Sequence, residues 1–258
     1  MHRSWQFLGI LVVAVLALYG PSVGHGFLYE DEMVLNEMPE EPGVRDYGRA
    51  FWMAAPESGW RPVWRWALML QKGVAGAASP VPYRAVTLAL VVAAGLLVFR
   101  LLRLAPMGIG QKPAFCAALL TVVHPVASAN VYRLAEGQAA LLALVFMVGS
   151  AAFFLQGDRV WHAAGALILY LLALGSHSQA LWFPLILAVA EGVRLSRNAA
   201  ARDESEVNGP VHLTVVRPEQ PARIRWRRVA SFLIAALACL AIRHAVMGSL
   251  AEGVTIGP

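Results

Sequence analysis

Long apolar runs joined by short polar connections constrain the fold of this chain more than any other feature. A helix crosses the hydrocarbon core of a bilayer with about 20 apolar residues. Runs of this kind lie at residues 5–24, 83–103, 114–127, 138–155, 160–175, 179–194 and 229–247, the third, fifth and sixth being short. With 58% hydrophobic and 14% charged residues, the chain is too apolar for an ordinary soluble domain. We predict an all-α polytopic membrane protein with about seven transmembrane helices.

The basic residues between these runs predict how the chain is oriented in the membrane. Arg100, Arg103 and Lys112 fall on the same predicted side as the segment 194–228, which holds eight arginines and four acids. Short loops rich in Lys and Arg stay in the cytoplasm. We therefore expect a cytoplasmic N-terminus and an outward-facing loop at residues 25–82. The same placement accounts for the net charge of +5 without nucleic acid as a partner.

We expect one membrane domain over residues 1–258. It comprises a first helix at 1–24, the outer loop at 25–82, a helical bundle at 83–195, a basic and flexible cytoplasmic loop at 196–228, and a last helix with an outer tail at 229–258. A cleaved signal peptide is the alternative for the first run, but the positive-inside pattern favours a retained helix. Cys116 and Cys239 both lie in apolar runs, so we predict no disulfide framework and no paired-cysteine metal site.

The predicted outer loop changes character along its length. Its first part is acidic and contains the consecutive carboxylates Glu30, Asp31 and Glu32. Its second part, WRPVWRWALMLQKGV at residues 60–74, mixes tryptophans with basic residues. Aromatic and basic residues at this density are typical of a helix that lies in the membrane interface. We predict that this second part folds back onto the bilayer surface as an interfacial helix.

Several short motifs follow one another in a recognisable order. FLYEDE lies beyond the first run, WRPVWRWAL follows in the same loop, an H-P pair occurs at His124 and Pro125, and a run containing Pro184 follows the polar turn 176–179. This order, over most of residues 1–195, resembles the amino-terminal half of the GT-C membrane glycosyltransferases. It is most similar to the transmembrane and tetratricopeptide-repeat O-mannosyltransferases and their bacterial relatives. The resemblance implies a GT-C-like helical bundle, which we expect in a bacterial inner membrane.

The resemblance also implies an activity and a set of site residues. GT-C enzymes transfer a sugar, here expected to be mannose, from a polyprenyl-phosphate carrier to a hydroxyl of a protein or glycan acceptor outside the cytoplasm. By its place in the family motif, Asp31 is the expected general base, with Glu30 beside it. Arg61, Arg133 and Arg243 are the candidate cations for the phosphate of the lipid donor, since a guanidinium group can bind phosphate with two hydrogen bonds. Membrane lipids are the other expected partners, and we expect no cofactor and no metal site.

Each candidate residue also has a simpler interpretation. The acidic cluster can serve only to solvate a loop, and a divalent cation is a third hypothesis, although one short cluster offers few ligands. Arg133 can pair with Glu136, three residues on. Arg243 lies close enough to the end of its run for the side chain to reach the interface. Pro125 lacks an N–H and is expected to interrupt a helix, so His124 before it can bond a freed carbonyl. The further site candidates are Glu32, His124 and His177.

A second class of function stays open. Some polar site residues of the family are replaced here: Ala127, Ser128 and Ala129 follow the H-P pair, and His177 and Ser178 stand where the family has a lysine and a glutamate. The chain also ends just past the seventh run, before the later spans and helical repeats of the family. We therefore also consider a truncated form of such an enzyme, and a non-catalytic membrane interaction or scaffold subunit built on the same fold.

Overall fold

The structure, a computed structural model, describes residues 2–52, 59–104, 107–157, 159–192 and 222–253. The regular elements in these ranges are helices, as predicted. They are α1 (His2–Tyr19), η1 (Gly20–Gly24), α2 (Tyr29–Asn36), α3 (Val44–Trp52), α4 (Pro62–Ala75), α5 (Val81–Arg103), α6 (Gln111–Val123), α7 (Pro125–Tyr132), α8 (Leu134–Gln156), α9 (Val160–Ser176), η2 (Ser178–Trp182), a helix over 183–192, and α11 (Ala222–Gly253). Most of the predicted cytoplasmic loop at 196–228 lies outside the described residues.

Four helical stretches are long and apolar enough to cross a membrane. They are Trp5–Gly24, Val81–Arg103, Leu134–Gln156 and Trp226–Met247. Each coincides with a run predicted from the sequence, which is compatible with an integral membrane protein. The helices at the other three predicted runs, Gln111–Val123, Val160–Ser176 and 183–192, are shorter than the about 20 residues that span a bilayer core.

The third predicted run is divided at the H-P pair. Proline disfavours helical backbone at the residue before it, and His124 accordingly has an extended backbone, with φ −62° and ψ 140°. The α6 helix therefore ends at Val123, and α7 starts again at Pro125. This is the helix interruption that the sequence predicts.

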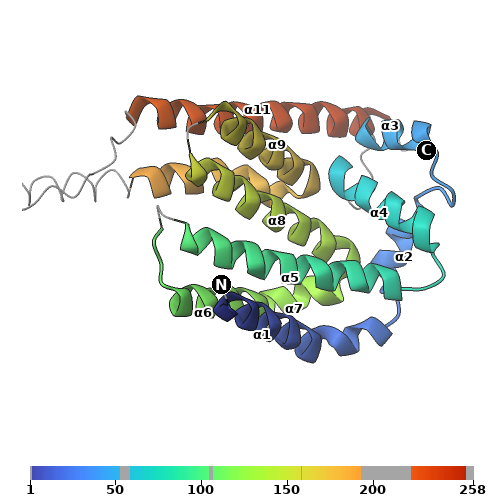
Figure 1. The fold of residues 1–258 in the computed structure, drawn as a ribbon. Helices are drawn as coiled ribbons and strands as arrows, with labels where there is room; N and C mark the ends of the chain where they lie inside the picture. The colour runs from blue at the N-terminus through green and yellow to red at the C-terminus, as the bar shows by residue number, and fades with distance from the viewer. Residues whose placement is uncertain (1, 53–58, 105–106, 158, 193–221, 254–258) are drawn as a thin grey trace, which may run out of the picture.

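The long helices pack side by side as a bundle (Figure 1). The α1 helix packs on α5 and α6, α5 packs on α8, and α8 packs on α9. One end of the bundle, at the right in Figure 1, carries α2, α3 and α4 together with the starts of α5 and α8. The end of α5 and the starts of α6, α9 and α11 lie at the opposite end. The described residues of the predicted outer loop are therefore gathered at one end of the bundle.

Close packing and a few polar contacts join the helices. Lipid chains are as apolar as the side chains, so helices in a bilayer associate through such contacts rather than through the hydrophobic effect. The Tyr19 hydroxyl of α1 donates to the Val122 carbonyl of α6 at 2.7 Å. At Gly175 of α9, an added Cβ would lie 2.6 Å from a methyl carbon of Val63, so only glycine allows α4 to approach this closely.

The α4 helix forms within the segment predicted to be interfacial, but its aromatic and basic residues face other helices. Trp64, Arg65 and Lys72 are all buried. The Lys72 ammonium donates to the carbonyls of Leu35 and Met38 at 2.8 and 2.7 Å, at the C-terminal end of α2. A cation is favourable there because the last carbonyls of a helix have no partners within it. Lys72 thus fastens α2 to α4 instead of meeting lipid.

Candidate functional site

The candidate site is built around the junction between α7 and α8. The α7 helix ends at Tyr132 and α8 begins at Leu134, so a single residue, Arg133, separates them. The first turn of α8 lies directly against α7 at Gly137, where an added Cβ would overlap the carbonyl oxygen of Asn130. A backbone atom cannot move aside as a side chain can, so glycine is required for this tight turn.

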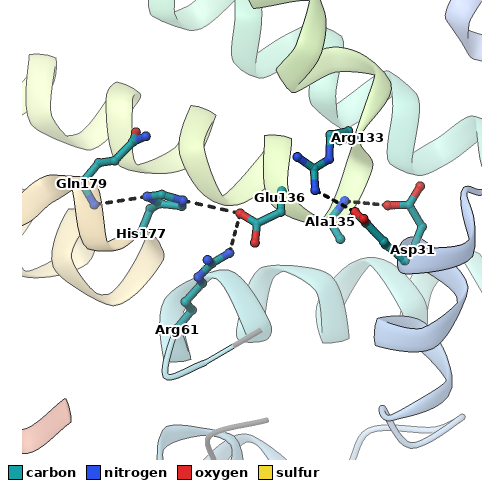
Figure 2. A network of polar contacts seen from close by, with 8 residues as sticks. Asp31, Arg61, Arg133, Ala135, Glu136, His177 and Gln179 are labelled. Atoms are coloured by element: carbon teal, nitrogen blue, oxygen red, sulfur yellow. Dashed lines mark hydrogen bonds and ion pairs between the residues drawn. The ribbon is translucent and has the colours of Figure 1, made fainter. Parts of the chain in front are cut away.

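Asp31, the predicted general base, caps two helices at once. Asp31 as a whole residue is only 1% exposed. One carboxylate oxygen, Oδ2, accepts from the Leu28 N–H at 3.0 Å at the start of α2, and Oδ1 accepts from the Ala135 N–H at 2.8 Å at the start of α8 (Figure 2). Unpaired N–H groups at helix N-termini favour a negative charge. Asp31 therefore holds α2 against the start of α8.

Arg84 caps the other side of the junction. It is 1% exposed, and its Nη1 donates to the carbonyls of Val131 and Tyr132 at 2.7 and 2.8 Å, at the end of α7. Its Nη2 donates to the Gly26 carbonyl at 3.2 Å. The negative end of a helix favours a cation, so Arg84 complements α7 as Asp31 complements α8.

Glu30, the residue before Asp31, lies on the exposed side of the same helix. Its Oε2 is 2.9 Å from Nη2 of Arg133, and the two side chains are 59% and 53% exposed. The hydrogen bond to Glu30 raises the pKa of Arg133, which keeps the guanidinium charged. Exposed ion pairs contribute little to stability because water screens them. Because both side chains are more than half exposed, a ligand can reach either group.

Arg61, Glu136 and His177 form a second polar group beside the first (Figure 2). Arg61 Nη1 donates to Oε2 of Glu136 at 2.9 Å, and His177 Nε2 lies 3.5 Å from the same oxygen. The Gln179 N–H donates to His177 Nδ1 at 3.2 Å. Because Nδ1 accepts a hydrogen bond, the ring proton of neutral His177 is assigned to Nε2, facing Glu136. The Arg61 and His177 side chains are mostly buried, whereas Glu136 is 37% exposed.

These two groups are joined through the first turn of α8. Arg133 contacts Glu30 of α2, and the Ala135 N–H contacts Asp31 of the same helix. Glu136 contacts Arg61 at the start of α4. One turn further along α8, the buried Gln138 side-chain nitrogen lies 2.9 to 3.1 Å from the Tyr83 carbonyl, the Thr87 hydroxyl and the Gln71 side-chain oxygen. The start of α8 is thereby tied to α2, α4, α5 and the turn before η2.

The structure brings together most of the residues singled out in the sequence, but not all. Arg243 lies beside a small hollow with Trp60 and Ser178, which are the chain neighbours of Arg61 and His177. His124 lines a different cavity, of about 250 Å³, between α5, α6, α7 and α8. Glu32 is exposed on α2. The predicted site residues on α2, at the start of α4 and at the start of α8 are therefore contiguous. Arg243 borders this group, whereas His124 lies in another part of the bundle.

Two residues of the site were not assigned to it from the sequence. Glu136 was considered only as a local partner of Arg133, but it pairs with Arg61, while Arg133 pairs with Glu30. Arg84 was not singled out, although an arginine inside an apolar run is a general signal of a functional or structural polar site. That signal was available for Arg84 as it was for Arg243.

Within the described ranges of the chain, no group of three or more His, Cys, Asp or Glu side chains is arranged to hold a metal ion. No family model matches this chain, and searches of curated proteins and of solved structures also return no match. The resemblance to GT-C enzymes stays a prediction from motifs. A function must therefore be argued from the geometry of the site.

Proposed function

We propose that this chain is a membrane-embedded glycosyltransferase of the GT-C type. It transfers a sugar, with mannose as the first hypothesis, from a polyprenyl-phosphate carrier to a hydroxyl of a protein or glycan. The observation that carries this proposal is the meeting of acidic and basic side chains from α2, α4, the start of α8 and the turn before η2 at one end of an apolar bundle (Figure 2). A lipid-linked donor and a water-soluble acceptor can both reach such a place.

The proposed reaction is a direct displacement at the sugar. The acceptor oxygen attacks C1, the bond from C1 to the phosphate oxygen breaks, and the polyprenyl phosphate leaves with the bonding electron pair. The proton of the acceptor hydroxyl passes to a carboxylate, and the configuration at C1 is inverted. A positioned general base typically contributes about 10²- to 10⁴-fold to such a step.

Within this proposal, Glu30 is better placed than Asp31 to take the proton. Both oxygens of Asp31 accept backbone N–H groups and the residue is only 1% exposed, so an acceptor hydroxyl has little access to this carboxylate. Glu30 is 59% exposed, and its ion pair with Arg133 is at the surface. We therefore assign Asp31 to positioning α2 on α8 and Glu30 to the chemistry.

Arg133 is the first candidate for the donor phosphate. It lies beside Glu30 and is accessible, so a phosphate can replace the carboxylate as its partner. Arg61 is held by Glu136 and stacks near the Trp64 ring, 5.8 Å from the ring centroid. It contributes positive charge next to the site. Arg243 borders the same region from α11 and is the third candidate.

The finer topology is part of the same proposal. Seven passes, in which the shorter helices also cross the membrane, place the acidic loop outside the cytoplasm. Arg100 and Arg103 end α5, Lys112 lies in the first turn of α6, and Arg159 precedes α9. All belong to the bundle end opposite the site (Figure 1). By the positive-inside rule their charge favours a cytoplasmic location for that end, and a bacterial inner membrane is the membrane that we propose.

A non-catalytic membrane scaffold is the second candidate function. It is favoured by the capping role of Asp31, which uses both carboxylate oxygens to hold α2 on α8. It is also favoured by the pairing of Glu30, Arg61, Arg133 and Glu136 with one another. In this function the charged contacts stabilise a surface that docks another membrane protein.

The test is transfer of radiolabelled sugar by the purified wild-type chain in lipid vesicles. Polyprenyl-phosphate mannose and polyprenyl-phosphate glucose are supplied as separate donors, with short hydroxyl-bearing peptides and glycans as acceptors. Labelled acceptor in the wild type, and its loss in Glu30→Gln, would support the transferase. Counts equal to those of empty vesicles with both donors, from folded and inserted protein, would contradict the transferase and favour the scaffold.

A further inference from the structure

The α3 helix exposes apolar and basic side chains on one face. Val44 and Trp52 are 91% and 65% exposed, and Arg45 and Arg49 are also exposed. With 3.6 residues per helical turn, these four positions lie within an arc of about 140°. We refer to these four residues as the α3 face. Tryptophan and an apolar residue beside basic residues are typical of helices that lie at a membrane interface.

The opposite side of α3 is fastened to α4, so the direction of the α3 face is set by the fold. Ala50 is buried, and the Tyr47 carbonyl accepts the indole N–H of Trp66 at 2.7 Å. The Phe51 carbonyl accepts the indole N–H of Trp60, also at 2.7 Å. The α3 face cannot turn inward without breaking these contacts.

The two arginines of the α3 face have guanidinium groups that are not engaged in ion pairs within the described residues. In the part of the chain that the structure describes, neither Arg45 nor Arg49 forms an ion pair. The acid on the same helix, Asp46, is used at its start, where Oδ2 accepts the Gly43 N–H at 2.9 Å. The face therefore presents two guanidinium groups between a valine and a tryptophan.

The α3 helix lies near one end of a candidate membrane span. Trp60, which holds the end of α3, lines a hollow with Leu240 and Arg243, close to the end of the span Trp226–Met247. Figure 1 shows α3 beside that end of α11. Exposed Leu70 and Val74 lie on α4, whose Gly73 is close to Pro42, just before α3. Exposed apolar side chains of α4 therefore lie near the segment that leads into α3.

We propose that the α3 face docks onto the surface of the surrounding bilayer and binds the phosphates of anionic phospholipids. Val44 and Trp52 enter the boundary between headgroups and acyl chains, where tryptophan is favoured. Arg45 and Arg49 bind the phosphates, and a basic residue near an anionic surface contributes on the order of a fivefold preference. The interfacial element is then α3, whereas α4, predicted for this role from its sequence, is packed inward.

A fluorescent label at position 44 tests this proposal independently of any enzyme activity. The full-length chain carries Cys116→Ser, Cys239→Ser and Val44→Cys, and is labelled with bimane. A matched chain carries Glu40→Cys, an exposed position before α3. Both are inserted into vesicles of phosphatidylcholine, with or without phosphatidylglycerol. Nitroxide groups on lipid headgroups and aqueous iodide serve as quenchers.

We expect the headgroup nitroxide to quench the label at position 44 more strongly than the label at position 40, and iodide to do the reverse. Phosphatidylglycerol should increase nitroxide quenching at position 44. Arg45→Gln with Arg49→Gln should remove that increase, and Arg45→Lys with Arg49→Lys should retain it. The proposal is overturned if the label at position 44 is as accessible to iodide as the one at position 40 in both kinds of vesicle. The proposal is also overturned if phosphatidylglycerol still increases nitroxide quenching at position 44 in the variant with Arg45→Gln and Arg49→Gln.

Discussion

The Arg61 guanidinium lies 2.9 Å from the Glu136 carboxylate, although 75 positions separate the two residues in the chain. Arg61 precedes α4 and Glu136 lies in the first turn of α8, so this contact joins the loop at 25–82 to the bundle. His177 approaches the same carboxylate oxygen from the turn before η2. Glu136 is thus contacted by two side chains from other parts of the chain, Arg61 and His177.

Replacing Glu136 with Gln should loosen the contact between α4 and α8. The amide keeps the shape but loses the charge, and a hydrogen bond to a charged group contributes about 1.5 to 3 kcal/mol. Since Glu136 is partly exposed, we expect a loss near the lower end of that range. Thermal unfolding in detergent measures it. Glu32→Gln, at an exposed position near the site, is the matched control and should leave the Tm unchanged. An unchanged Tm in Glu136→Gln would show that the contact between Arg61 and Glu136 does not stabilise the fold.

Gly137 should tolerate no side chain. An added methyl group would overlap the Asn130 carbonyl oxygen, so α7 and α8 must separate. Overpacking of this kind costs about 1 to 3 kcal/mol or more, and we expect Gly137→Ala to lie at the upper end. Gly9→Ala in α1 is the control, since an added Cβ there meets nothing within 4 Å. Equal unfolding temperatures for the two variants would show that the α7–α8 turn is looser than described.

Arg84→Met should be among the most damaging single substitutions in α5. It leaves the carbonyls of Val131, Tyr132 and Gly26 without their donor. A buried acceptor left without a donor typically costs about 1 to 3 kcal/mol, and three carbonyls lose their donor here. Arg100→Met, at the exposed far end of the same helix, removes an equal charge and should cost much less. A wild-type yield and Tm for Arg84→Met would contradict the proposed capping of α7.

The apolar runs were sufficient to predict the helices of the described residues and four candidate membrane spans, because the length of an apolar run indicates whether a helix can cross a bilayer. The break at His124 was also predictable, since it depends on the residue next to Pro125. The composition of α4 did not predict whether its tryptophans and basic residues face lipid or other helices. Tryptophans and cations suit a lipid interface and an interior network equally well, and the carbonyls that Lys72 caps belong to α2, far away in the sequence.

The sequence singled out the acidic cluster of the candidate site, but it did not separate the roles of its members. Glu30 and Asp31 are adjacent and chemically alike, yet one is exposed and the other is buried between two helix starts. The difference arises from the 3.6-residue period of α2, which turns neighbouring side chains to different faces. The pairing of Glu136 with Arg61 depends on the packing of α4 against the start of α8 and cannot be obtained from local spacing.

The most direct test of the central claim is the initial rate of sugar transfer in Glu30→Gln beside Glu32→Gln. Both residues are exposed on α2, but only Glu30 is paired with Arg133. The account predicts that Glu30→Gln keeps the wild-type Tm and loses about 10²- to 10⁴-fold in rate, the usual contribution of a general base, whereas Glu32→Gln keeps both. Transfer at the wild-type rate by folded Glu30→Gln would contradict the assignment of the chemistry to this carboxylate.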